Sequence, residues 1–203
     1  MHNQFSVNER QYQGVNRTIC IGLGGTGRDV LMRVRRLIVD RYKDLSNLPV
    51  VSFVHIDTDK EATQAVSLRT GNIYQGIDLG FQDSEKVNAT MTAPQVTELV
   101  QGLEQCHSNR HQPSPYEHIA QWFPPQLIQN IKAIDQGAKG IRPIGRLAFF
   151  QNYLKIKNAI EVAEQRTRKH EQELLRKFGL IVDPGLNIVV VGSLCGGTGM
   201  EHF

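Results

Sequence analysis

The chain alternates short apolar runs with longer stretches in which apolar residues recur every three or four positions. The short runs are Arg17–Ile21, Val50–Ile56 and Leu186–Val191, of which the last is the most hydrophobic. Runs that are apolar at nearly every position are typical of parallel strands covered by helices on both faces. Residues 28–42 follow helical spacing instead. The apolar face of this helix is expected to comprise Val30, Leu31, Val34, Leu37 and Ile38, and its basic residues Arg28, Arg33, Arg35 and Arg36 are expected largely on the other faces.

The order strand, helix, strand is the opening of a parallel α/β sheet. We expect a third strand at Asn72–Leu79, where apolar residues alternate, and a turn at Pro184–Gly185 before the fourth strand. The predicted fold is therefore an α/β, Rossmann-like domain over residues 15–203, with strand order 3-2-1-4 and helices on both faces. A polar leader at residues 1–14 is expected to be disordered, and the domain is expected to be truncated after its fourth strand.

The middle of the chain predicts a helical insertion at about residues 82–135, which is rich in Gln, Asn, His and Pro. Thr92 is suited to cap a helix that has Pro94 in its first turn. The apolar surface of the insertion is expected to consist of Leu99, Leu103, Ile119, Trp122, Phe123, Leu127, Ile128 and Ile131. A glycine-bearing loop at Gly137–Gly145 then leads into one long helix, expected from Arg146 to about Phe178, with a charged and solvent-facing distal half.

Two glycine-rich loops, both reading Gly-Gly-Thr-Gly, follow two of the predicted strands. The first comprises Gly22, Gly24, Gly25, Thr26 and Gly27, and the second comprises Gly196, Gly197, Thr198 and Gly199 after Cys195. A glycine loop between a strand and a helix exposes backbone N–H groups to a phosphate, and glycine permits close approach and positive φ. The two threonines add hydroxyl donors. Together the loops predict one phosphate-binding site built from two segments.

These loops allow three interpretations, of which the sequence excludes one. The first loop matches the dinucleotide fingerprint, and Asp57 ends the next strand, as expected for an NAD-dependent or ATP-using Rossmann-type enzyme. That reading leaves the second loop unexplained, and Asp57 lies beyond the usual spacing. A P-loop is excluded because no lysine and hydroxyl pair follows either glycine run. A third reading is a non-catalytic interaction module that uses the helical insertion.

Composition narrows the function classes only a little. The net charge of +3 gives no basis for binding nucleic acid. No apolar segment reaches the roughly 18 residues that a membrane span needs. The three cysteines are far apart, which favours reduced thiols and a cytoplasmic location. The group Cys106, His107, His111 and His118 fits no zinc spacing, so we expect no metal site from these residues.

The second glycine loop, Cys195-Gly196-Gly197-Thr198-Gly199-Met200, resembles the signature Gly-Gly-Gly-Thr-Gly-Ser-Gly of the tubulin/FtsZ superfamily. The order of the other motifs agrees. Residues 22–27 resemble the first nucleotide loop of the family, residues 53–59 the strand that ends in Asn-Thr-Asp, and residues 142–146 the loop before its third helix. The resemblance covers about residues 15–80 and 136–200 and is greatest to the divergent bacterial tubulin-like group. The chain departs from the pattern at Cys195, Glu201 and Ile144.

The resemblance implies that GTP or GDP binds with Mg²⁺ at the carboxyl ends of the strands. Gly24, Gly25 and Thr26 would approach the phosphates, and the second loop would wrap them. Asp57 and Asp59 would lie near the metal, the phosphates or the ribose, and Arg146 would reach the ribose or the terminal phosphate. An intact relative would assemble head to tail and hydrolyse GTP across the subunit contact. This chain alone is expected to lack the hydrolytic part, which lies downstream of Phe203 in the family.

Overall fold

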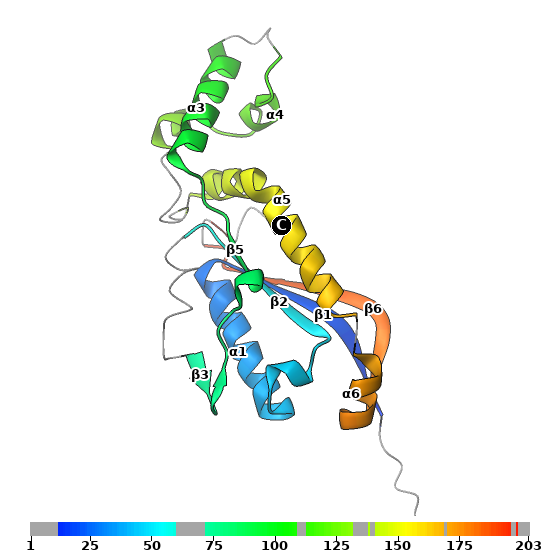
Figure 1. Cartoon of the computed structure of the whole chain (residues 1–203). Helices are drawn as coiled ribbons and strands as arrows, with labels where there is room; N and C mark the ends of the chain where they lie inside the picture. The colour runs from blue at the N-terminus through cyan, green and yellow to red at the C-terminus, as the bar shows by residue number, and fades with distance from the viewer. Residues whose placement is uncertain are drawn as a thin grey trace, which may run out of the picture.

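The computed structural model of the chain describes residues 12–59, 72–108, 113–131, 138, 141–168, 170–195 and 198. Its main sheet has four strands, β1 (Gln13–Leu23), β2 (Val51–Asp57), β5 (Lys86–Asn88) and β6 (Leu180–Val191), in the order β5-β2-β1-β6. All three strand pairs are parallel, as Figure 1 shows. The predicted α/β class and the strand order 3-2-1-4 are therefore confirmed. Gln13 and Gly14 of the predicted leader already belong to β1, and residues 1–11 lie outside the described residues.

The third strand of the sheet is not the segment that the sequence pattern indicated. Residues 72–79 contain a two-stranded antiparallel hairpin, β3 (Ile73–Tyr74) and β4 (Ile77–Asp78), which is separate from the main sheet. Gln75 and Gly76 connect its strands with φ values of 51° and 81°. Positive φ at both central residues is the geometry of a tight hairpin turn, so the chain reverses here. The third strand is β5, which lies inside the predicted insertion and follows the 3-10 helix η3 (Asp83–Glu85).

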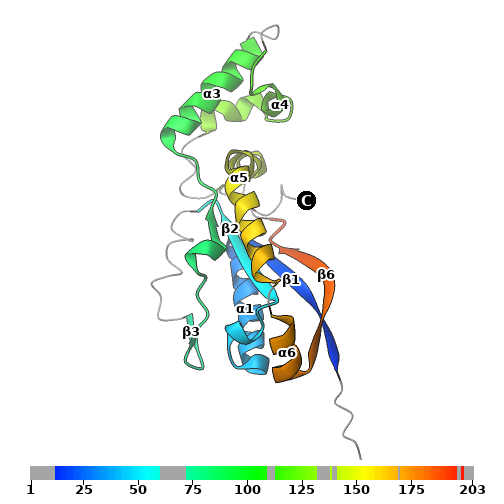
Figure 2. The same ribbon diagram turned by 45° about the vertical axis from the view of Figure 1, so that its right-hand side comes forward.

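Helices cover both faces of the sheet (Figures 1 and 2). On one face α1 (Gly24–Tyr42) and α6 (Glu171–Phe178) bury Leu31, Ile38 and Leu174 against Cys20 and Phe53. On the other face α5 (Arg142–Arg166) buries Ile156 and Ala163 against Ile19, Val54 and Ile56. Side chains of β2 alternate between these two clusters, as the pleat of a strand requires. A further 3-10 helix, η1 (Leu45–Asn47), follows α1.

Two details of the predicted helices are wrong. The single helix from Arg146 to Phe178 is in fact α5 followed by α6, because the two cover opposite faces of the sheet and no continuous helix can do both. In α1 Leu37 is exposed to 66%, whereas Arg35 is exposed to only 2%. The prediction of a turn at Pro184–Gly185 is wrong as well. These residues lie inside β6, at an irregularity where the register with β1 shifts opposite Asn16 and Arg17.

The helical insertion has a core of its own. It contains α3 (Ala93–Ser108), α4 (Glu117–Ala120) and the 3-10 helix η4 (Pro125–Asn130), and Figure 2 shows α3 and α4 beyond the edge of the sheet from which β5 leads. All of its predicted apolar residues pack in one cluster, which continues into Ile144, Leu147 and Ala148 of α5. The insertion is thus attached to the first turns of α5. None of the described helices is long and apolar enough to cross a membrane.

A buried ion pair links α1 to the segment before β5. Arg35 Nη2 lies 2.6 Å from Glu85 Oε2, and Arg35 Nη1 donates to the carbonyl oxygens of Leu79 and Gly80 at 2.9 and 2.8 Å. The guanidinium lies between two aromatic rings, 4.6 Å from the centroid of Phe53 and 4.3 Å from that of Phe81. Burial lowers the pKa of Arg35, and the nearby Glu85 carboxylate opposes that effect.

Removing the acidic partner should be costly, because a buried charge without its counter-ion is strongly destabilising. We expect Glu85→Gln to lower the free energy of unfolding by about 3 kcal/mol, measured by urea denaturation. Asp83→Asn is the matched control, because Asp83 pairs with Lys86 at a fully exposed position, and we expect it to change stability by less than about 1 kcal/mol. Equal losses for the two variants would contradict the role given to the buried pair.

Candidate functional site

The carboxyl ends of the parallel strands bring both glycine loops to one edge of the sheet. β1 ends at Leu23 and α1 begins at the next residue, so the first glycine loop is itself the amino terminus of the helix. β6 ends at Val191, shortly before the second loop. β1 and β6 are paired neighbours, and β2 ends on the other side of β1. Ligands of open α/β sheets usually bind at the carboxyl ends of the strands. They bind between two neighbouring strands whose connecting segments run to opposite sides of the sheet.

The amino terminus of α1 is open. Leu23 is its N-cap residue, no side chain caps the helix, and no acidic residue lies in its first turn. The first N–H groups of a helix have no partner within the helix, so these donors are available to an external acceptor. Gly24 has φ of +66°, which favours glycine, and a Cβ added at Gly25 would meet nothing within 4 Å. The loop thus presents free backbone donors beside open space.

Two other glycines in this loop serve close packing. A Cβ at Gly27 would lie 2.6 Å from the carbonyl carbon of Gly22 and 2.6 Å from the carbonyl oxygen of Val191. A Cβ at Gly22 would lie 2.8 Å from the Gly27 backbone. Both distances are too short for any side chain, so glycine is required where α1 crosses β1 and β6. The sequence reading assigned all these glycines to phosphate contact, whereas the structure separates packing glycines from exposed ones.

The two loops meet at Thr198. A Cβ at Gly24 would lie 3.5 Å from Cβ and 3.8 Å from Oγ1 of Thr198, which is ordinary van der Waals contact. Thr198 is buried, and its hydroxyl shares a hydrogen bond of 2.9 Å with that of Thr58, just beyond the end of β2. The backbone N–H of Ala138 donates to the same Thr58 hydroxyl at 3.0 Å. Gly196, Gly197 and Gly199 lie outside the described residues.

The acidic residues at the end of β2 lie at the same edge. Asp57 is 4% exposed, and its Oδ1 accepts a hydrogen bond of 3.1 Å from the backbone N–H of Asp59. Burial raises the pKa of Asp57 above its ordinary value, and the hydrogen bond from Asp59 opposes that shift. A nearby cation would favour its ionised form. Sequence reasoning selected both carboxylates but missed Thr58 between them, although it belongs to the same Asp-Thr-Asp motif.

His55, in β2, is a further residue of this edge that the sequence analysis did not select as a site residue. It is fully buried, its Nε2 lies 3.2 Å from the carbonyl oxygen of Gly24, and its ring stacks on Phe81. A carbonyl oxygen only accepts, so Nε2 carries the proton, while Nδ1 has no hydrogen-bond partner among the residues that the structure describes. Burial lowers the pKa of His55 to about 4, so the ring is neutral at pH 7. This histidine therefore holds the backbone of Gly24 at the start of α1.

Arg146 lies in the first turns of α5, against the insertion. Its guanidinium carbon is 4.1 Å from the ring centroid of Trp122 and 5.8 Å from that of Phe150. The interactions described for Arg146 thus join the insertion to α5. None of them is with Gly24, Thr198 or Asp57.

A family model described as tubulin like matches residues 19–201. The chain belongs to the tubulin-like family. The match starts within β1, spans the insertion and reaches the second glycine loop, so it includes both Gly24 and Thr198, which lie near each other. The resemblance to the tubulin/FtsZ superfamily is thereby confirmed. Comparisons of the tubulin-like chain with curated proteins and with solved structures give no match.

The thiols and imidazoles of the tubulin-like chain form no metal centre in the part that the structure describes. No group of three or more His, Cys, Asp or Glu side chains there could hold a metal ion. Cys20 is buried and Cys195 exposed, and both are free. His111 lies outside the described residues.

The packing contact at Gly27 gives a direct test of this geometry. We expect Gly27→Ala to lower the free energy of unfolding by about 2–3 kcal/mol, because the methyl group would overlap two backbone atoms. Gly25→Ala is the matched control in the same loop. There the methyl group meets open space, and alanine favours the helix by up to about 1 kcal/mol, so stability should be unchanged or slightly higher. Similar losses in thermal or urea denaturation would show that the contact is not as described.

Proposed function

We propose that the tubulin-like chain binds a guanine nucleotide, GTP or GDP, with its phosphates between the two glycine loops. The observation that carries this proposal is the proximity of Thr198 to Gly24, where an added Cβ would lie 3.5 Å from the Thr198 Cβ, because it brings two loops far apart in sequence together at one strand edge. Neither loop in isolation distinguishes a nucleotide site from a structural turn. Membership of the tubulin-like family supports guanine as the base.

Backbone donors of the first loop supply the phosphate contacts. The N–H groups at Gly25 and Thr26 begin a helix that has no capping side chain, and the helix dipole adds a partial positive charge there. Gly25 offers room for an oxygen to approach, because its absent Cβ would point into open space. The second loop, Gly196–Gly199, closes the site in this proposal, with the Thr198 hydroxyl as a donor.

Asp57 and Asp59 suit a magnesium ion by their chemistry, because Mg²⁺ prefers oxygen ligands and binds through one or two carboxylates plus phosphate. When bound, the ion would offset phosphate charge. The raised pKa of Asp57 fits this role, since a buried carboxylate without a cation is costly and a cation would restore its charge. We leave Arg146 out of the proposed set, because its guanidinium lies on the indole ring of Trp122.

A competition titration tests the binding proposal. Fluorescent GTP with Mg²⁺ should bind and be displaced by GTP but poorly by ATP or NAD. Thr198→Val should weaken binding by about tenfold or more, the usual loss of a hydrogen bond to a charged group. Gly25→Ala should weaken binding while leaving stability intact. Thr97→Val is the control, because Thr97 is an exposed residue of α3 whose hydroxyl donates to the carbonyl oxygen of Ala93 in the same helix. Displacement by NAD alone, or equal binding by all variants, would contradict the proposal.

Self-assembly is the second part of the proposal, since the tubulin-like family implies possible self-assembly. Head-to-tail contact would place the nucleotide edge of one subunit against the next. We expect sedimentation of the protein to increase with GTP relative to GDP, and to lose that dependence in Thr198→Val. Equal sedimentation under all conditions and at all concentrations would remove assembly from the proposal while leaving nucleotide binding untouched.

A further inference from the structure

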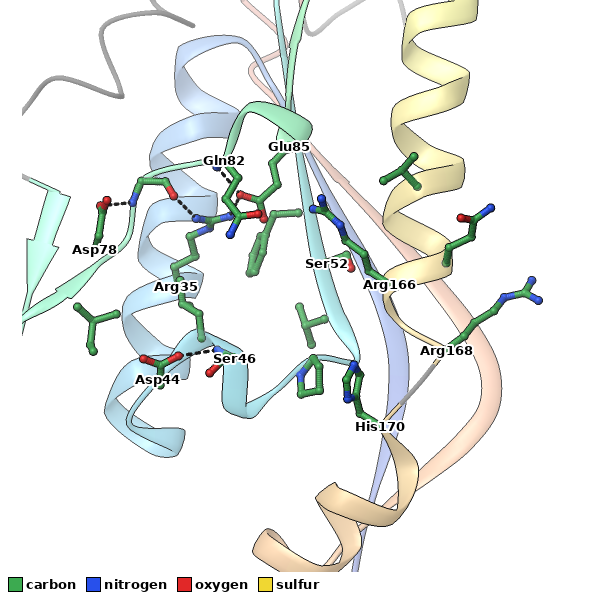
Figure 3. A pocket seen from close by; sticks show the side chains of 18 of the residues that line it. Arg35, Asp44, Ser46, Ser52, Asp78, Gln82, Glu85, Arg166, Arg168 and His170 are labelled. Carbon is green, nitrogen blue, oxygen red and sulfur yellow. Dashed lines mark hydrogen bonds and ion pairs between the residues drawn. The ribbon is translucent and has the colours of Figure 1, made fainter.

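A cavity of about 1000 Å³ lies beside the start of β2, far from the glycine loops, which follow the carboxyl ends of the strands. Its walls come from α1, η1, the segment 76–85 and the end of α5, as Figure 3 shows. None of the residues proposed for the nucleotide site lines it. The cavity is therefore separate from the proposed nucleotide site.

The base of the cavity is an open sheet edge. β5 pairs with His55–Asp57, so in the part of the chain that the structure describes Val51–Phe53 have no neighbouring strand on that side. The backbone N–H of Thr18 donates to the carbonyl of Val50, so residues 50 and 52 turn their backbone groups to β1, and Val51 and Phe53 turn theirs away from it. The N–H of Val51 already donates to Leu48. Among the described residues, the carbonyls of Val51 and Phe53 and the N–H of Phe53 take part in no strand pairing or loop hydrogen bond.

The side chain of Arg35 prevents segment 79–82 of the same chain from pairing with this edge of β2. The guanidinium is held between the rings of Phe53 and Phe81 and is fixed by the carbonyls of Leu79 and Gly80. The arginine thus separates the segment from β2 by the thickness of a side chain. A slot remains along β2, with the buried Arg35–Glu85 pair as part of its lining.

The walls of the cavity differ in charge. On the α5 side Arg166 is exposed and points toward the slot in Figure 3, and the only partner described for it is the hydroxyl of Ser84. Arg168, by contrast, is paired with Glu164, and His170 lies 3.8 Å from Glu173. The opposite wall carries the carboxylates of Asp44 and Asp78. A ligand that matches both walls has an acidic group on one side and apolar or basic groups on the other.

We propose that the open edge of β2 binds an extended segment of a partner protein by strand addition, with an acidic side chain of that segment against Arg166. Alternate side chains of a strand point to opposite faces, so a segment with an acidic residue on one face and apolar or basic residues on the other matches the two walls. Main-chain hydrogen bonds give such complexes affinity, and side-chain pockets give them specificity. Three open backbone groups at the base of a cavity suit one short chain rather than the long exposed edge of a second sheet.

The test selects ligands from a displayed library of random decapeptides on the full chain. We expect enriched peptides with an acidic residue on one face and apolar or basic residues on the other. A synthetic peptide of the enriched sequence should bind Arg166→Glu at least about tenfold more weakly, because the substitution places like charges together. Arg176→Glu, an exposed arginine of α6 away from the cavity, is the matched control and should bind normally. N-methylation of the peptide at alternate residues should abolish binding, and the peptide should slow hydrogen exchange at the Phe53 amide.

Four results would overturn the proposal: no enriched peptide, equal binding to Arg166→Glu and wild type, tolerance of N-methylation at every position, or unchanged exchange at Phe53. Concentration-dependent self-association that is lost in Arg166→Glu would assign the edge to a second copy of the chain instead. The proposal is independent of the nucleotide site. Arg166→Glu should leave displacement of fluorescent GTP unchanged, so failure of either proposal can be recognised separately.

Discussion

The close approach of Gly27 to the backbones of β1 and β6 is the constraint on which the candidate site depends. A methyl group at this position would lie 2.6 Å from atoms of both Gly22 and Val191, so the first turn of α1 can rest directly on the strands only because residues 22 and 27 are glycines. That contact fixes the amino terminus of the helix between the ends of β1 and β6. The open donors at Gly25 and the contact of Gly24 with Thr198 follow from it.

A second constraint, the buried guanidinium of Arg35, shapes the other end of β2. Burying a charge is favourable only when hydrogen bonds and an opposite charge compensate for lost water. Glu85 and two carbonyls do so here, and the aromatic rings of Phe53 and Phe81 enclose the remaining surface. The chain around residues 79–85 is therefore arranged around a cation rather than paired with the sheet. This arrangement around Arg35 leaves part of β2 without a paired strand among the described residues. The proposed peptide site depends on that unpaired part.

Sequence patterns predicted what depends on local periodicity and little of what depends on contacts between distant segments. The strands β1, β2 and β6 were recognisable because each contains a run of apolar residues, and their order was predicted correctly. The apolar residues that form the core of the insertion were recognisable as well. β5 has only three residues, too few for any period to emerge. The sequence pattern predicted Arg35 on a polar face of the helix, because helical spacing gives no information about its partners at residues 79–85. Thr58 and His55 act through contacts with Thr198 and Gly24, which exist only once the sheet has formed.

The hydrogen bonds around Thr58 connect the candidate nucleotide edge with the helical insertion. Thr198 belongs to the second glycine loop, and Ala138 packs in the same apolar cluster as the insertion. One buried hydroxyl thus bonds to both at once. A threonine hydroxyl donates one hydrogen bond and can accept others, so Thr198 could accept from Thr58 and donate its own proton to a phosphate, which would extend the hydrogen bonds from Ala138 and Thr58 to the nucleotide. If the edge binds nucleotide as proposed, the insertion is positioned to respond to it, because its attachment to the sheet includes this hydrogen bond.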